Sequence, residues 1–234
     1  MRKTAVRVLK LARGLLAVLI LASATWAAPI YLDTFDLTSF GPFTAYEGLP
    51  EHQTQTSVPE ALGGARILDL RATGALGVTS RIVPIILPRL PIGYLTLSSD
   101  EGTSADMDLT WNIGGQDFLS QGMWRFIIRG RSDLGVGGSM IVRDGATAIS
   151  KDFYIAPGSV WAEYTLPFTT FGPGYQTAFS SVDSITLRFS NTVDNLDAAV
   201  DYVGFGVPEP MTLLLIGTGL VGLGLLRRHH RRSR

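Results

Sequence analysis

The end of the chain is the feature that most limits what this sequence can fold into. An apolar run, Met211–Leu226, contains no charged residue, and five arginines follow it. As a helix rising about 1.5 Å per residue, the run would reach about 24 Å, close to the length that spans a bilayer. Positive charge beside a membrane segment favours the cytoplasmic side. We therefore predict a transmembrane helix at 211–226 with a basic tail at 227–234, which directs or holds the protein and does not build its core.

The beginning of the chain has the order typical of a secretory signal peptide. Basic residues precede an apolar run, Leu15–Ala24, and small residues follow it. We predict a signal-peptide helix within residues 1–27 and cleavage after Ala27, because Thr25 and Ala27 then occupy the two positions that require small side chains. An uncleaved N-terminal membrane anchor is the alternative.

The residues in front of the terminal apolar run read Pro208-Glu209-Pro210. This motif, an apolar helix and a basic tail, in that order, resemble the PEP-CTERM sorting signal of Gram-negative bacteria. The resemblance covers residues 207–234. It implies recognition by an exosortase-type membrane protease, cleavage near the motif, and a transient stay in the inner membrane. The final location would be the cell surface or the extracellular matrix, often with exopolysaccharide or biofilm. An ordinary tail anchor is the alternative.

Composition acquires meaning once the two ends are set aside. The terminal segments contain ten of the 20 basic residues but only one of the 20 acidic residues, so the middle of the chain is acidic. An acidic exported domain is poorly suited to phosphate backbones, and we predict no nucleic-acid partner. The sequence has no cysteine, which excludes thiol catalysis, disulfides and cysteine-based metal sites.

Residues 28–206 have the pattern of one all-β domain. Short apolar or alternating runs are separated by Gly, Pro, Asn, Asp and Ser, and no internal stretch has sustained helical periodicity. Strands with one buried face close most easily as two packed sheets, so we predict a β-sandwich of jelly-roll type. The expected strands are Ile30–Phe35, Ala65–Leu70, Ile92–Leu97, Met107–Ile113, Met123–Arg129, Ser139–Val142, Ile149–Tyr154, Trp161–Leu166, Ser184–Phe189 and Ala198–Phe205.

Two stretches fit this pattern less clearly. Three prolines interrupt Ser80–Pro91, which we interpret as an extended edge or a buried crossover. Gly41–Gly64 is polar and rich in turn residues, so we expect a long surface loop. Trp124 alternates with Phe126 and Ile128, which predicts that it points into the core.

Two segments resemble the galactose-binding-like jelly rolls of carbohydrate-binding modules. Residues 157–168 resemble a family strand in which a tryptophan precedes an aromatic residue and then Pro-Phe. Residues 182–189 and 198–205 resemble the last two strands of that family. The resemblance implies the fold, and it implies sugar binding for many members but not for all.

The sequence offers little support for catalysis. His52 is the only histidine of the middle region, no serine lies in a Gly-x-Ser-x-Gly context, and a zinc site without cysteine is improbable. The densest acidic group that could serve a glycosidase consists of Asp100-Glu101, Asp106 and Asp108, of which Asp106 and Asp108 share one strand face. Solvated loop acids are the better interpretation, and we predict that the protein is not an enzyme.

The candidate ligand site consists of Trp111, Asn112 and Arg129. A sugar ring stacks on an exposed aromatic side chain, while amides and charged groups bond its hydroxyls. We expect Trp161 to be packed rather than exposed.

A structural calcium ion is a separate expectation. The jelly-roll resemblance implies one between the first and last strands, and carboxylate oxygens suit Ca²⁺. The candidate ligands are Asp33 and Asp36 at the start of the domain with Asp197 and Asp201 at its end. Ordinary turn acids are the alternative.

The sequence thus predicts an exported, non-enzymatic envelope or matrix protein associated with polysaccharide. A structural or adhesion protein without a small ligand is the second hypothesis, and a polysaccharide hydrolase or lyase is the third.

Overall fold

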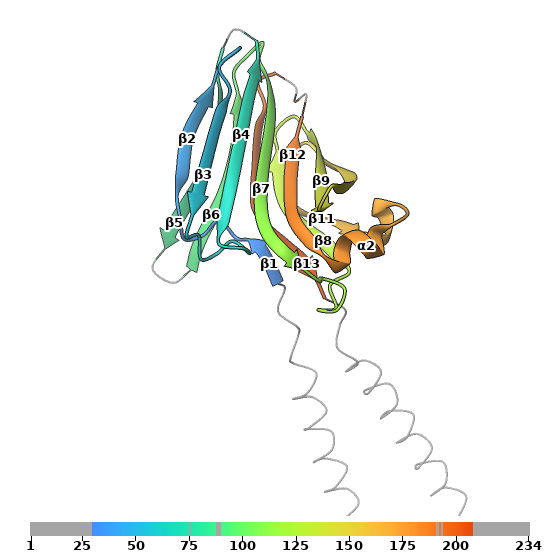
Figure 1. Ribbon diagram of the computed structural model, residues 1–234. Helices are drawn as coiled ribbons and strands as arrows, with labels where there is room; N and C mark the ends of the chain where they lie inside the picture. The colour runs from blue at the N-terminus through green and yellow to red at the C-terminus, as the bar shows by residue number, and fades with distance from the viewer. Residues whose placement is uncertain (1–29, 75, 88–89, 191, 193, 208–234) are drawn as a thin grey trace, which may run out of the picture. The chain divides into compact units, whose positions relative to one another are not determined.

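The computed structural model describes residues 30–74, 76–87, 90–190, 192 and 194–207. They belong to one compact unit, Pro29–Val207, built from two antiparallel sheets that pack face to face (Figure 1). The predicted signal peptide, the Pro208-Glu209-Pro210 motif, the transmembrane helix and the basic tail lie outside the described residues.

The first sheet has the order β11-β8-β13-β6-β5-β2, with β1 pairing to β13 beyond the end of β6. Its strands are β1 (Ile30–Asp33), β2 (Phe40–Ala45), β5 (Val78–Leu87), β6 (Leu90–Ser99), β8 (Arg125–Ser132), β11 (Gly158–Pro167) and β13 (Asp197–Gly206).

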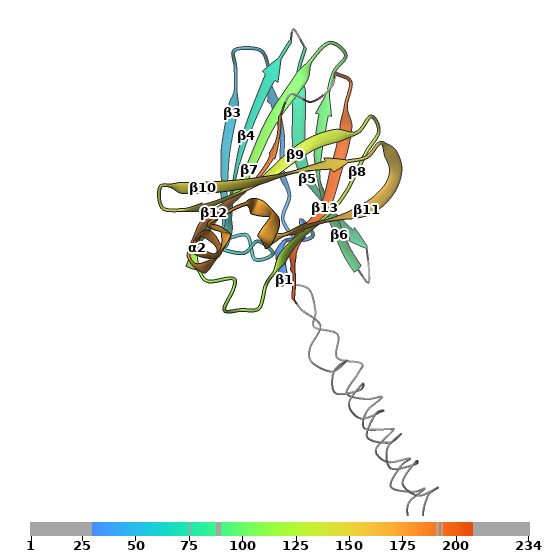
Figure 2. The same ribbon diagram turned by 90° about the vertical axis from the view of Figure 1, so that its right-hand side faces the viewer.

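The second sheet has the order β10-β9-β12-β7-β4-β3. Its strands are β3 (Glu51–Thr56), β4 (Ala65–Thr73), β7 (Ser104–Gln116), β9 (Val136–Asp144), β10 (Thr147–Ile155) and β12 (Val182–Phe189). The strands twist across this sheet, so that β9 and β10 run at a large angle to β3 and β4 (Figure 2).

The strand order confirms the predicted jelly roll. From β6 onward the chain builds two four-stranded sheets, β6-β13-β8-β11 and β7-β12-β9-β10. Each successive strand crosses to the other sheet, except for the β9–β10 hairpin. Two interlocked Greek keys of this kind define the jelly roll. The earlier strands extend both sheets, with β5 and β2 on one and β4 and β3 on the other.

Alternation along the strands produces the core. In β8, Phe126 and Ile128 are fully buried, while Arg125, Ile127 and Arg129 are partly exposed on the other face. The prediction for Trp124 was wrong: its side chain is 41% exposed, because β8 begins at Arg125, two residues later than expected, and Trp124 precedes the strand. The guanidinium of Arg125 instead lies 4.5 Å from the centre of the Trp124 ring.

The polar stretch Gly41–Gly64 is not one long loop. It contains β2 and β3, which form the outer strands of the two sheets. The β3 sequence Glu-His-Gln-Thr-Gln-Thr contains no large apolar residue. A strand at a sheet edge tolerates such a composition, since fewer neighbouring strands bury its side chains. The polar composition therefore concealed a strand.

The proline-rich stretch forms most of β5 and the start of β6, which make a hairpin. β5 lies between β6 and β2, so it is neither an edge strand nor a crossover. However, β2 pairs only with residues 78–82 of β5, and Pro84 lies beyond them with β6 as its partner. The proline therefore needs no backbone donor on its second side.

A phenylalanine cluster closes one end of the core. Phe168 of the short 3-10 helix η1 (Phe168–Phe171) stacks on Phe179 of α2 (Tyr175–Ser180), with ring centres 3.7 Å apart. Phe126 packs beside this pair, with its ring centre 5.4 Å from that of Phe168, and the ring centre of Phe205 lies 5.1 Å from that of Phe126. Among the described residues, no helix is long and apolar enough to cross a bilayer.

A buried polar cluster ties the first strand to the second sheet. Arg66 and Asp33 are both fully buried, and the Arg66 guanidinium donates to the two carboxylate oxygens at 3.1 and 2.9 Å. The Trp111 indole donates to the same carboxylate at 2.9 Å. Arg66 also donates to Gln55 and to the Thr38 carbonyl. Each charge is matched, as burial requires.

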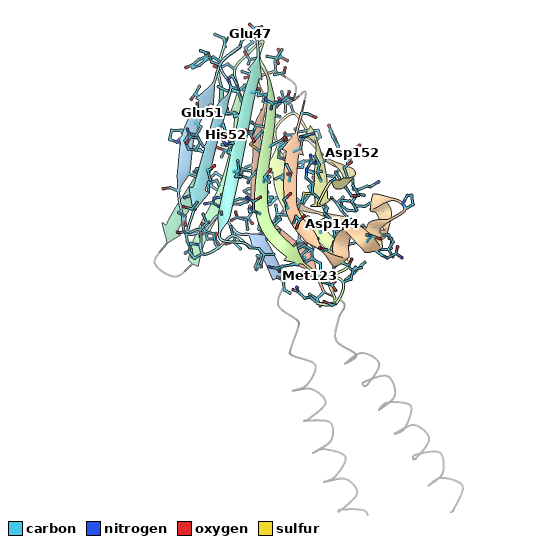
Figure 3. The ribbon with its side chains drawn as sticks, in the orientation of Figure 1. Glu47, Glu51, His52, Met123, Asp144 and Asp152 are labelled. Carbon is cyan, nitrogen blue, oxygen red and sulfur yellow. The ribbon has the colours of Figure 1, made fainter. Side chains whose placement is uncertain are left out.

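The first and last strands of the unit pair with each other. Ile30 is opposite Phe205, so both ends of the described unit leave the sandwich side by side. Figure 3 shows Met123 close to this end and Glu47, in the turn between β2 and β3, at the opposite end.

Candidate functional site

Aromatic side chains gather on the outer face of the first sheet. Strand alternation points them away from the core, and each is at least partly exposed. We call this surface the aromatic face. It comprises Tyr31 of β1, Tyr94 of β6, Trp161 and Glu163 of β11, Arg129 and Arg131 of β8, and Asp201 and Tyr202 of β13.

Trp161 and Tyr94 bridge the middle of the sheet. Their strands, β11 and β6, are separated by β8 and β13, which is roughly 14 Å at about 4.8 Å per strand spacing. Even so, the two ring centres are only 6.3 Å apart. Ala199 of β13 faces the same side and is only 6% exposed, as expected beneath such a layer. The two rings therefore form a continuous apolar surface.

A second aromatic pair continues this surface toward β1. Tyr31, which is 39% exposed, meets Tyr202 edge to face, with ring centres 5.3 Å apart. The Tyr202 hydroxyl donates a hydrogen bond to Glu163. Burial, followed by the Glu163 carboxylate, raises the pKa of the Tyr202 hydroxyl above its usual range. Tyr202 is therefore a fixed neutral donor, and its ring position is set by Glu163.

Two arginines flank the Trp161 ring. The Arg131 guanidinium lies 4.8 Å from the ring centre and that of Arg129 lies 6.0 Å from it, within cation–π range. Arg129 also pairs with Asp201 at 3.0 Å. Burial raises the pKa of the Asp201 carboxyl, although the Arg129 charge opposes the shift. The aromatic face thus combines apolar rings with both donors and acceptors.

The outer face of the second sheet has a different chemistry. A cavity of about 220 Å³ is lined by Asp69, Arg71, Asp106, Met107, Asp108, Arg188, Phe189 and Ser190. We call it the polar cavity. Arg188 donates to both oxygens of Asp108, at 2.7 and 2.6 Å. Phe189 points into the core, so the polar cavity presents no exposed ring.

Polar pairs continue across this second sheet on either side of the polar cavity. His52 of β3 is bonded to Asp69 of β4 at 2.6 Å, and Ser139 of β9 donates to Asp152 of β10 at 2.6 Å. Figure 3 shows His52 and Asp152 well apart on this sheet. The two faces of the sandwich therefore differ: aromatic rings cluster on the first sheet, whereas polar pairs dominate the second, on which Tyr154 of β10 is an exposed ring.

The structure does not assemble the predicted ligand site. Trp111 is 0% exposed and its indole is bonded to Asp33, so it cannot present a ring to a sugar. Asn112 is exposed on the outer face of the second sheet, whereas Arg129 lies on the outer face of the first. In β7, Trp111 alternates inward together with Met107 and Leu109, so its ring belongs to the core and not to the surface.

The four predicted calcium ligands do not form one cluster either. Asp33 is committed to Arg66 and Trp111, and Asp201 to Arg129. Asp36 accepts from the Gly93 amide at 2.6 Å, and Asp197 from the Ser98 hydroxyl. Among the described residues, no group of three or more His, Asp or Glu side chains could hold a metal ion. These residues do not fit the expected site, and calcium binding itself stays a prediction.

Several residues of the aromatic face escaped sequence reasoning. Trp161 was expected to pack inside, and Tyr94, Tyr202 and Arg131 were not considered. A signal was available for Tyr202, because Val203 and Phe205 alternate inward and leave Tyr202 outward. For Trp161 no such signal was available, because residues 158–165 of β11 are all exposed or partly exposed and its pairing with β8 is irregular between Gly158 and Ala162.

Comparison with known protein families finds a match at the end of the chain. The model of the PEP-CTERM protein-sorting motif matches residues 206–232. The chain carries a PEP-CTERM sorting motif. This motif implies export and membrane anchoring through the C-terminus. No curated protein matches the sequence.

The solved structures to which the chain is similar include carbohydrate-binding modules. The chain is 15% identical to the module TmCBM61, solved with beta-1,4-galactotriose, over 59% of this chain and 88% of that one, with a TM-score of 0.38. The chain is 11% identical to the family 11 module of Lic26A-Cel5E from Clostridium thermocellum, over 67% of this chain and 95% of that one, with a TM-score of 0.40. It is 10% identical to an exo-beta-agarase, over 60% of this chain and 23% of that one, with a TM-score of 0.43. The assignment of the jelly roll rests on the strand order.

Proposed function

We propose that this protein is an exported envelope or matrix protein that binds polysaccharide through the aromatic face. The sorting motif supports export, and an exosortase-type protease is the proposed processing partner. The observation that carries the binding role is the bridge between Trp161 and Tyr94, with arginine and carboxylate groups at its rim. Sugar rings stack on such surfaces, and neighbouring charged groups bond their hydroxyls.

Removal of the Trp161 ring tests this role. We expect Trp161→Ala in the unit Pro29–Val207, which contains both complete sheets and their core, to weaken binding to the producer's exopolysaccharide about tenfold. Such a loss corresponds to about 1.4 kcal/mol and matches the removal of one stacking surface. Affinity electrophoresis measures it, and ligand-induced fluorescence change should disappear with Trp161.

The matched control is Trp124→Ala. Trp124 is also exposed and also has an arginine over its ring, but it lies at the end of the sandwich near Met123. It should leave affinity unchanged. Equal losses in the two variants would contradict a site at the aromatic face, and flat titrations of the unaltered protein with all polysaccharides would favour a purely structural matrix or adhesion role.

The polar cavity is the one observation that favours the hydrolase or lyase alternative. It brings Asp106 and Asp108 together with Asp69, and paired carboxylates are what glycoside hydrolysis requires. However, the bidentate pair with Arg188 occupies both oxygens of Asp108. That alternative requires polysaccharide cleavage that is abolished by Asp106→Asn or Asp108→Asn, with reducing-end release as the measurement.

A further inference from the structure

Arg131 differs from the other charged groups of the aromatic face because it has no hydrogen-bond or ion-pair partner among the described residues. Its guanidinium lies over the Trp161 ring. By contrast, Arg129 is paired with Asp201, and Glu163 accepts from Tyr202. On the opposite sheet Arg188 is held by Asp108 through two hydrogen bonds. The hydrogen-bond donors of Arg131 are therefore available.

A guanidinium stacked on a ring has a defined preference in ligands. Its N–H groups lie in the guanidinium plane and form a fork that matches a carboxylate or sulfate, and stacking holds the fork in place before binding. A neutral sugar that stacks on the same side of the indole has to displace this cation. An anionic sugar gains an ion pair with it and can retain the stack.

Whole-molecule charge cannot supply this preference. The unit between the two terminal segments is acidic, with 19 of the chain's 20 acidic residues, so a polyanion is repelled by most of its surface. Any preference for anionic polymers must come from a local arrangement of cations. The Arg131–Trp161 stack, with Arg129 beside it, is such an arrangement.

We propose that the aromatic face selects acidic polysaccharide, with Arg131 binding a sugar carboxylate or sulfate while Trp161 and Tyr94 stack on the sugar rings. This inference rests on the proposed function and adds the substrate class to it. Carboxylate and sulfate share the chemistry that the guanidinium fork recognises, and separate polymer pairs distinguish them.

The experiment measures affinity for matched polymers by isothermal titration calorimetry. Polygalacturonate and its carboxyl-reduced form test the carboxylate, and dextran sulfate and dextran test the sulfate. We expect at least one anionic polymer to bind about tenfold more tightly than its neutral counterpart. Arg131→Ala should remove that difference, and Arg131→Lys, which keeps the charge but loses the fork, should restore only part of it.

The matched control is Arg81→Ala, which removes an exposed arginine from the same outer face, on β5. It should leave the preference intact. A neutral polymer that binds as tightly as its anionic counterpart, or equal losses for both polymers in Arg131→Ala, would overturn the substrate class and leave polysaccharide binding standing. Equal losses of the preference in Arg81→Ala would overturn the assignment to Arg131. Absence of binding to every polymer would overturn both proposals.

Discussion

At the scale of single residues, Arg66 is a buried charged side chain that depends on several polar partners. It is fully buried beside Asp33, and its guanidinium reaches Gln55, the Thr38 carbonyl and Glu60 as well. A buried ion pair contributes little compared with a well-packed apolar pair, but removal of one partner leaves an unmatched charge in the core. The cluster should therefore be sensitive to change in either partner.

We expect Arg66→Met to lower the free energy of unfolding by roughly 3–5 kcal/mol, because Asp33 loses its counterion while remaining buried. Urea denaturation followed by tryptophan fluorescence measures the loss. Arg188→Met is the control: its partner Asp108 is partly exposed, and a loss of about 1 kcal/mol or less is expected there. Similar losses in both variants would mean that the buried cluster is not a special contributor.

The sequence contained a signal for Arg66 but not for its partners. Within the expected strand Ala65–Leu70, alternation places Arg66 on the same side as Leu68 and Leu70, which predicts a buried charge. Asp33 and Trp111 are 33 and 78 residues from their partners in this cluster, and no local pattern connects them. The same limitation led to Trp111 being proposed as an exposed platform.

At the scale of elements, one loop depends on a glycine for its position. The segment between β3 and β4 passes close to the end of β7 at Gly63, which has a φ of +85°. A Cβ atom at this position would lie 1.9 Å from the Asn112 carbonyl oxygen. Both the backbone conformation and the lack of space therefore require glycine.

Gly63→Ala should destabilise the protein by more than the roughly 1 kcal/mol that a positive φ alone costs, since the loop must move away from β7. Gly48→Ala separates the two effects: Gly48 also has a positive φ, +73°, but a Cβ there would meet nothing within 4 Å. Thermal melting of both variants provides the measurement. A loss at Gly63 no larger than at Gly48 would contradict the steric argument.

Elements were predictable in proportion to how completely they are buried on one face. β8 and β12 have regular inward apolar positions, and the sequence located them to within three residues at each end; β13 was located as well, although its register shifts between Val200 and Tyr202. β3 and β2 lie at sheet edges, where polar residues are tolerated, so their composition resembled a loop. The prolines of β5 suggested that the whole strand lies at an edge or is a crossover, whereas only its part beyond Ile82 has a single partner, β6.

At the scale of the whole molecule, the aromatic face exists only because distant segments are brought together. Tyr31, Tyr94, Trp161 and Tyr202 come from four strands, and their proximity follows from β1 pairing with β13 and β11 pairing with β8. The sequence predicted the jelly roll but not its strand order. Since the order decides which outer faces coincide, the fold class was accessible and the site was not.

The position of β13 has a consequence for when the protein can finish folding. This strand lies in the interior of its sheet, between β8 and both β6 and β1, and it ends at Gly206, only four residues before the apolar run at Met211. The first sheet therefore cannot close until this last strand has been synthesised, because β6 and β1 reach β8 only through β13. A chain that stopped before Asp197 would keep unpaired edges on β6 and β8 and could not complete the native sandwich, so the ten residues of β13 control whether all the others are protected from aggregation.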